Sequence, residues 1–346
     1  MRVLVFVFAI FGLMTAPTDA AQPRPVVAEF TSSDTVLAWI NRYRHKPDPQ
    51  RLPAAIQTLS RAGTFRDPES CGVYIGFIAG VIGSNPERAS DLIAQSFPLD
   101  AEDHWAMVRA IANSGLPDWK HLLAEHAHRM PTRHVMIDKY ISGALPTLRD
   151  TVARKPPTAT QKLKRFLTRA TPEGPAVDWA LDVSPEVLDM LWGQYFATGD
   201  YGPVLRIVAL LPWSADRDSV DRLTLGAMAK YTLASNSARN HELLTLLKRS
   251  ALHQPEDTRK ILAQVTEAAD TMQLAAIRKE AIAAIEELKR KGPGSKRDVM
   301  TWGRVGEGAI ALGCIGAAAT GQVALGLPCV IGGAVSSAAL RAWAGQ

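Results

Sequence analysis

ESCGVYIGFIAGVIGSNP, residues 69–86, is the stretch that decides how the chain is expected to fold. Glu69 is its only charged residue, and the apolar residues that follow cover every side of a helix instead of one stripe. A helix of this kind is stable only when protein surrounds it, and Asn85-Pro86 gives it a clear end. The sequence therefore predicts a buried central helix.

The neighbouring segments have the period of half-buried helices. One face of the helix predicted over 34–45 is apolar and consists of Val36, Leu37, Ile40 and Tyr43. Ser184-Pro185-Glu186 is a favourable helix start, and Gly199-Asp200 predicts a tight turn to the next helix. Further helices are predicted over 53–62, 86–97, 100–114 and 118–130.

Alternating β patterns are scarce, so the predicted fold class is all-α. Pairs of short helices that follow one another every 30 to 40 residues or so are typical of an α-solenoid, in which each pair buries its open face on the next. The body resembles tetratricopeptide and HEAT repeats in this general way, although it lacks their diagnostic residue patterns. We expect a solenoid-like body of helical hairpins, followed by a Gly/Ala-rich C-terminal helical hairpin.

Changes of composition divide the chain. Residues 149–174 hold seven Lys or Arg against two acidic residues, with Pro156-Pro157 among them, which is typical of a solvated linker. The expected units are a signal peptide over 1–20, a helical domain over 21–148, this basic linker with a short helix over 149–174, a helical-hairpin domain over 175–254, a long helix over 255–291 that either is continuous or breaks near 270–273, a second basic linker over 292–304 and an uncharged hydrophobic hairpin over 305–346.

The first twenty residues resemble an export signal. Arg2 precedes an apolar run over 3–14, and the small residues Thr18 and Ala20 stand where a signal peptidase cleaves. The run is too short to span a bilayer comfortably. We expect export to the periplasm or an envelope membrane of a bacterium; the alternative is a buried N-terminal helix.

The tail GAIALGCIGAAATGQVALGLPCVIGGAVSSAAL, residues 308–340, has no charge. As one straight helix it would measure about 50 Å, well beyond the hydrocarbon core of about 30 Å. Either residues 308–327 form one span, or the segment folds back near Thr320-Gly321-Gln322. A hairpin would bring Cys314 and Cys329 together, so we predict a disulfide between them in an oxidising compartment. Cys71 is left as a buried thiol.

The hairpin is expected to contact either a membrane or the body of the protein. Its composition resembles the hydrophobic hairpin of pore-forming colicins. The residues expected to face lipid are Trp302, Ile310, Leu312, Ile315, Val323, Leu325, Leu327, Val330, Ile331 and Trp343. A basic cluster precedes the hairpin and is expected to face an anionic surface: Lys289, Arg290, Lys291, Lys296, Arg297 and Arg304.

Two motifs could carry chemistry. His121, Glu125 and His128 have the spacing of metal ligands on one helix face, but apolar residues define the opposite face, so the trio is expected to point to water. Glu69-Ser70 resembles the catalytic pair of lytic transglycosylases, which attach such a Glu to a helical superhelix. Here the other motifs of that family are missing, and a first-turn acid explains Glu69 without catalysis.

We find no nucleotide-binding or hydrolase motif, we expect no cofactor, and a net charge of +5 is too mild to indicate nucleic acid. The sequence thus favours a non-catalytic scaffold or interaction module of the envelope, with an unidentified protein or peptide partner and contact with a membrane through its tail. The alternatives are a membrane-inserting, pore-like protein and a peptidoglycan-cleaving enzyme that uses Glu69.

Overall fold

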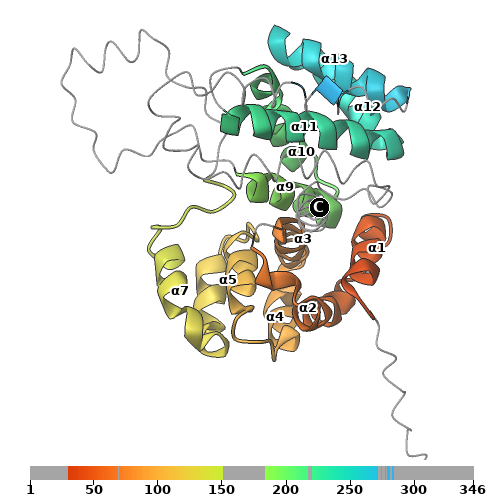
Figure 1. Cartoon of the computed structure of the whole chain (residues 1–346). Helices are drawn as coiled ribbons and strands as arrows, with labels where there is room; N and C mark the ends of the chain where they lie inside the picture. Colours follow the sequence, from red (N-terminus) through yellow and green to blue (C-terminus); the bar gives the residue numbers. More distant parts are fainter. Residues whose placement is uncertain are drawn as a thin grey trace, which may run out of the picture.

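Figure 1 shows a computed structural model of the chain, which describes residues 30–68, 70–150, 184–216 and 220–271 and the single positions 274, 277, 279, 280 and 283. Every regular element among these residues is a helix, so the predicted all-α class is confirmed. The signal segment, the basic linker beyond Asp150, Glu69, the basic cluster over 289–304 and the uncharged tail with its two cysteines lie outside the described residues.

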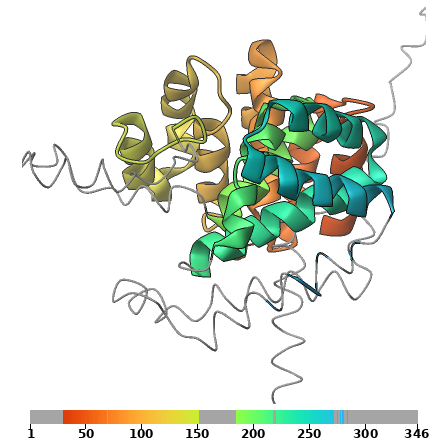
Figure 2. The same cartoon turned by 90° about the horizontal axis from the view of Figure 1, so that it is seen from above.

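The chain forms two groups of helices (Figure 1). The first group comprises α1 (Ser33–Tyr43), α2 (Leu52–Arg61), α3 (Gly72–Gly83), α4 (Ala89–Ser96), α5 (His104–Ala112), α6 (Trp119–Glu125) and α7 (His134–Ile141). The second comprises α9 (Pro185–Thr198), α10 (Gly202–Val208), α11 (Val220–Arg239), α12 (His241–Ser250) and α13 (Glu256–Asp270). Seen from above, α11–α13 overlie the side that holds α1–α3, whereas α6 and α7 extend to the other side (Figure 2).

Several predicted helices are shorter than their sequence patterns suggested. The segment 118–130 divides into α6 and a 3₁₀ turn over Ala127–Arg129, and 86–97 begins with a 3₁₀ turn over Pro86–Arg88. Helix α13 ends at Asp270, within the stretch where the sequence allowed a break, and Leu274 and Ile277 beyond it are helical again.

Helix α3 lies at the centre of the structure, as its sequence predicts. Every residue from Gly72 to Ile82 is buried, because α3 packs on α9 on one side and on α5 and α4 on others. In Figure 1 the α3–α9 pair lies where the two groups of helices meet. Most of the core is therefore organised around this pair.

Glycines bring the backbones of α3 and α9 into direct contact. Gly72, Gly76 and Gly80 recur every fourth residue, so they share one face of α3. A Cβ atom added at Gly76 would lie 2.1 Å from the carbonyl oxygen of Met190, and one added at Gly193 of α9 would lie 2.2 Å from that of Val73. No side chain fits at either position, so the closeness of the two helices depends on these glycines.

We predict that Gly76→Ala lowers the free energy of unfolding by about 3 kcal/mol or more, because the methyl group must push α9 away from α3 and such overpacking is costly. Urea denaturation of the purified protein measures the loss. Gly202→Ala is the matched control: its added carbon meets only the Asp200 side chain, at 3.2 Å, and we expect a change within about 0.5 kcal/mol. Equal stabilities of the Gly76 variant and the wild type would contradict the close contact.

Asp189 of α9 is a buried carboxyl group at the same interface. Its exposed fraction is zero, and neither carboxylate oxygen has a hydrogen-bond partner among the described residues. Burial, with a smaller contribution from the nearby Glu186 charge, raises the pKa of Asp189 well above its ordinary value. The carboxyl group is therefore expected to be neutral in the folded protein, which is how an unpaired buried acid avoids the cost of a buried charge.

A raised pKa in the folded state means that the folded chain binds more protons than the unfolded chain at pH values above about 4, the ordinary pKa of aspartate. The free energy of unfolding should accordingly fall as the pH rises from there towards the raised pKa. We predict that Asp189→Asn removes this fall, so that the variant gains stability relative to the wild type between about pH 5 and pH 8.

Asp150→Asn is a control of opposite sign in the same denaturation series. Thr147 donates to Asp150 Oδ2 through its backbone N–H and its hydroxyl, both at 2.8 Å, and these bonds lower the pKa of Asp150. This acid stabilises the fold above its unfolded pKa, so its replacement should cost stability at neutral pH. A difference between Asp189→Asn and wild type that does not change with pH would contradict the neutral buried carboxyl.

Candidate functional site

The three residues considered as metal ligands do not form a site. His121, Glu125 and His128 are all exposed, and because α6 ends at Glu125, His128 lies in the following 3₁₀ turn and loses the regular helical spacing. A hydrogen bond from Ser90 and the neighbouring histidines lower the pKa of Glu125. In the described part of the chain, no three His, Cys, Asp or Glu side chains are grouped so that they could hold a metal ion.

Ser90, Glu125 and His126 form a constellation that resembles part of a hydrolase triad. Ser90 Oγ lies 2.7 Å from Glu125 Oε1 and 3.0 Å from His126 Nε2. In a triad the serine donates its hydrogen to the imidazole, and an acid holds the other ring nitrogen. The single hydroxyl hydrogen of Ser90 serves one partner at a time, and when it is donated to Glu125, His126 Nε2 is the donor to Ser90.

With the Ser90 hydrogen on Glu125, His126 is not placed as the base for Ser90. A general base must accept the serine proton, whereas His126 Nε2 is the donor in that arrangement. Its other nitrogen, Nδ1, is buried and has no partner among the described residues. Burial also lowers the pKa of His126. The constellation joins α4 to the end of α6, and because His126 Nδ1 has no partner among the described residues, it lacks the acid–histidine contact of a triad.

Cys71 is a free, fully buried cysteine at the start of α3, in agreement with the sequence analysis. Its Sγ lies 3.5 Å from the carbonyl oxygen of Pro68. Burial raises the pKa of this thiol far above its ordinary value, and a thiol that does not ionise is a poor nucleophile. Cys71 is therefore a structural residue.

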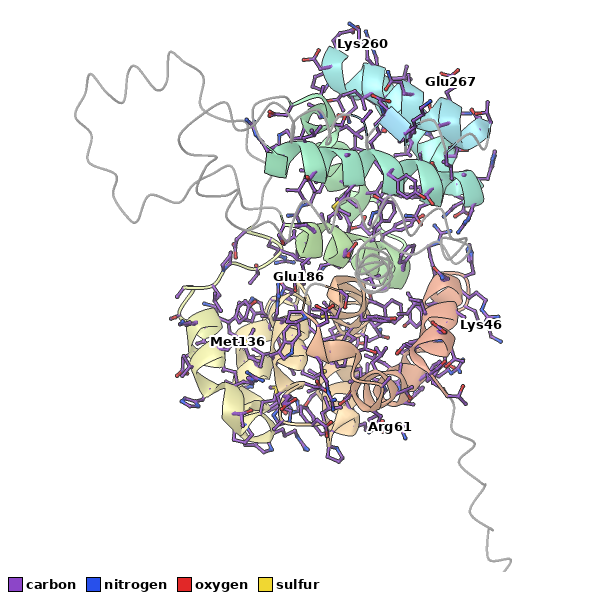
Figure 3. The ribbon with its side chains drawn as sticks, in the orientation of Figure 1. Lys46, Arg61, Met136, Glu186, Lys260 and Glu267 are labelled. Atoms are coloured by element: carbon purple, nitrogen blue, oxygen red, sulfur yellow. The ribbon has the colours of Figure 1, made fainter. Side chains whose placement is uncertain are left out.

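A hollow of about 390 Å³ lies between the end of α1, α9 and the start of α12, and we name it the Tyr195 hollow. Its volume falls within the range of about 300–1,000 Å³ that is usual for ligand pockets. The hollow lies beside the end of α1, and Lys46, which follows that end in the chain, is labelled in Figure 3. The described residues that line the hollow are Asn41, Arg44, His45, Tyr195, Phe196, Asn236, Arg239, Asn240, His241, Glu242 and Leu243.

Tyr195 lies at the centre of a hydrogen-bond network that joins three parts of the chain. Its hydroxyl oxygen accepts a hydrogen bond from Arg44 Nη1 and another, 2.9 Å long, from Asn240 Nδ2. Asn240 is also the N-cap of α12, because its Oδ1 accepts the backbone N–H of Leu243 at 3.1 Å. One asparagine side chain thus starts α12 and ties it to α9.

Arg44 closes the hollow on the side of α1. Its guanidinium carbon lies 5.2 Å from the centre of the Tyr195 ring, which is the range of a cation–π contact. Its aliphatic stem lies against Gly199, where an added Cβ would be 3.2 Å from Arg44 Cγ. Gly199 ends α9 in the left-handed conformation, with φ of 70°, as the predicted turn requires. A side chain there would be strained and would also displace Arg44.

The charges in the hollow favour an anionic ligand. Two arginines, Arg44 and Arg239, line it, and Glu242 is the one acid among the described lining residues. Burial raises the pKa of Tyr195 to about 12, so its hydroxyl keeps its hydrogen at neutral pH. The site can donate hydrogen bonds and attract negative charge, but its described residues include no activated nucleophile.

Sequence analysis did not single out Arg44, Tyr195 or Asn240. The Asn240-His241-Glu242 start of α12 has a recognisable capping pattern, so Asn240 could have been found as a cap. The bonds of Asn240 and Arg44 to Tyr195 could not, because the two residues lie 45 and 151 positions away from it and only tertiary packing brings them together.

No protein-family model, curated protein or solved structure matches this chain. Among the described residues, no helix is both long enough and apolar enough to cross a membrane.

Asn240 both caps α12 and bonds to Tyr195, so its replacement should destabilise the protein through both contacts. We expect Asn240→Ala to cost about 1–2 kcal/mol of unfolding free energy, since it removes both the cap of α12 and the bond to Tyr195. Asn240→Asp keeps the capping oxygen but removes the donor to Tyr195, so it should cost less. Thermal and urea denaturation of the three proteins measure the difference. If alanine and aspartate were equally costly, the cap would not contribute.

Proposed function

We propose that the protein is an exported, non-catalytic interaction module of the bacterial envelope, which binds a protein or peptide partner in the Tyr195 hollow and is held at a membrane by its C-terminal hairpin. The observation that carries the proposal is the hollow itself: its hydrogen-bond donors and cations converge on one space of ligand size. The membrane part of the proposal is supported by the sequence of the tail and by the basic cluster that precedes it.

The comparison of sites favours binding over catalysis. Ser90, Glu125 and His126 lack the order of a triad, because no acid among the described residues holds His126 Nδ1, and the Cys71 thiol is buried with a raised pKa. The Tyr195 hollow, in contrast, offers hydrogen-bond donors to an acceptor without providing a group that would break a bond in it. These donors can hold a ligand in the hollow by hydrogen bonds.

The second group of helices supports a solenoid-like description of the body. Each consecutive pair from α9 to α13 is in contact, and α13 also returns to pack on α11. In this interpretation the helices stack in chain order and the hollow lies along the stack, where such proteins bind extended partners.

We predict that deletion of residues 305–346 moves the protein from the membrane fraction to the soluble fraction of bacterial cells without loss of partner binding. To measure partner binding, His241 is replaced by a photo-crosslinking amino acid and the crosslinked product is detected. His241 is exposed and lines the hollow. The matched control places the crosslinking amino acid at Lys260, an exposed residue of α13 outside the hollow. A discrete crosslinked product is expected from position 241 only, in both the full and the shortened chain.

Two further measurements, of membrane permeabilisation and of cell-wall cleavage, separate the two alternatives. A pore-like protein would permeabilise membranes and lose that effect with its tail, and a wall-cleaving enzyme would lose its activity on Glu69→Gln. Equal crosslinking from positions 241 and 260, or a shortened chain that stays with the membrane, would contradict the proposal.

A further inference from the structure

Glu242 of the protein already occupies part of the Tyr195 hollow. Its Oε2 lies 3.4 Å from Arg44 Nη2. The two side chains differ in exposure: Arg44 is 13% exposed, whereas Glu242 is 66% exposed. The guanidinium is thus fixed at the wall of the hollow, while the carboxylate reaches it from the solvent side.

The pair is readily broken. Ion pairs with so exposed a partner contribute little, because water solvates the free carboxylate well. Arg44 itself would stay in place, since its other nitrogen, Nη1, is bonded to Tyr195 and its stem packs on Gly199. Removal of Glu242 therefore leaves a positioned guanidinium whose Nη2 faces the hollow and also lies 3.2 Å from His45 Nε2.

Tyr195 supplies the second half of a carboxylate site. Both of its hydrogen bonds bring a donor, from Arg44 and from Asn240, to the phenol oxygen. The hydrogen of the phenol consequently needs an acceptor of its own. One oxygen of a carboxylate can take this hydrogen while the other pairs with Arg44, as in other charge-assisted pairs.

We propose that the Tyr195 hollow binds a carboxylate group of the partner, which displaces Glu242 from Arg44 and accepts the hydrogen of Tyr195. The inference rests on the proposed function, because it takes the hollow to be the partner site. The carboxylate belongs either to an acidic side chain or to the C-terminus of a chain. In both cases Glu242 is a competitor built into the protein, and it weakens binding until the ligand replaces it.

The test uses the full chain in detergent and three fluorescent peptides of equal length, with fluorescence anisotropy as the measurement. One peptide has acidic side chains and an amidated end, one has neutral side chains and a free C-terminal carboxylate, and one has neither. We expect the wild type to bind at least one of the first two and not the third. Glu242→Gln should tighten this binding about 1.5-fold to 5-fold, by loss of the competing ion pair.

Arg44→Gln and Tyr195→Phe should each weaken the binding, by about tenfold or more for the arginine. Glu256→Gln is the matched control for Glu242→Gln: it removes an exposed first-turn acid from α13, outside the hollow, and should leave the affinity unchanged. The stronger binding by Glu242→Gln cannot result from misfolding, which keeps the test decisive even if the Arg44 variant is unstable.

The inference is overturned if neither carboxylate peptide binds, if the neutral peptide binds equally well, or if Glu242→Gln fails to tighten binding. These outcomes leave the proposed function standing as long as position 241 still crosslinks to its partner. Loss of that crosslink would instead remove the proposed function, whatever the peptides do.

Discussion

The contact between the backbones of α3 and α9 is the constraint on which the rest of the structure depends. Gly76 and Gly193 leave no space for a side chain at their positions, so the two backbones lie in direct contact there. Such contacts are usually associated with membrane helices, where small residues allow close approach. Here the contact lies inside the body and joins two groups of helices that are far apart in sequence.

Side chains of helix α9 bond to α5, to α11 and to the end of α1. Glu186 pairs with Arg109 of α5, and in Figure 3 Glu186 is labelled between the two groups of helices. Trp192 donates from Nε1 to Thr232 of α11 at 3.0 Å, and Tyr195 receives Arg44 from the end of α1. Because Gly193 fixes α9 against α3, it also fixes the position of Tyr195 two residues later. The same interface that stabilises the fold therefore positions the hollow.

The sequence predicts the helices well, because apolar period, caps and Gly or Pro ends are local signals. The repeated glycines of α3 were visible too, but their packing partner could not be deduced, since α9 begins more than 100 residues later. The hollow escaped prediction for the same reason: Arg44 and Tyr195 are ordinary residues of their own helices, and only their tertiary arrangement gives them a shared role.

The residues that line the hollow determine whether a fragment of this protein could still form it. Its residues come from 41–45, 195–196 and 236–243, so neither group of helices contains a complete binding surface. The hollow therefore cannot be transplanted as a short linear segment, and neither group of helices alone would reproduce it. A ligand in this hollow would contact both groups of helices at once, so both groups have to be present in one folded chain.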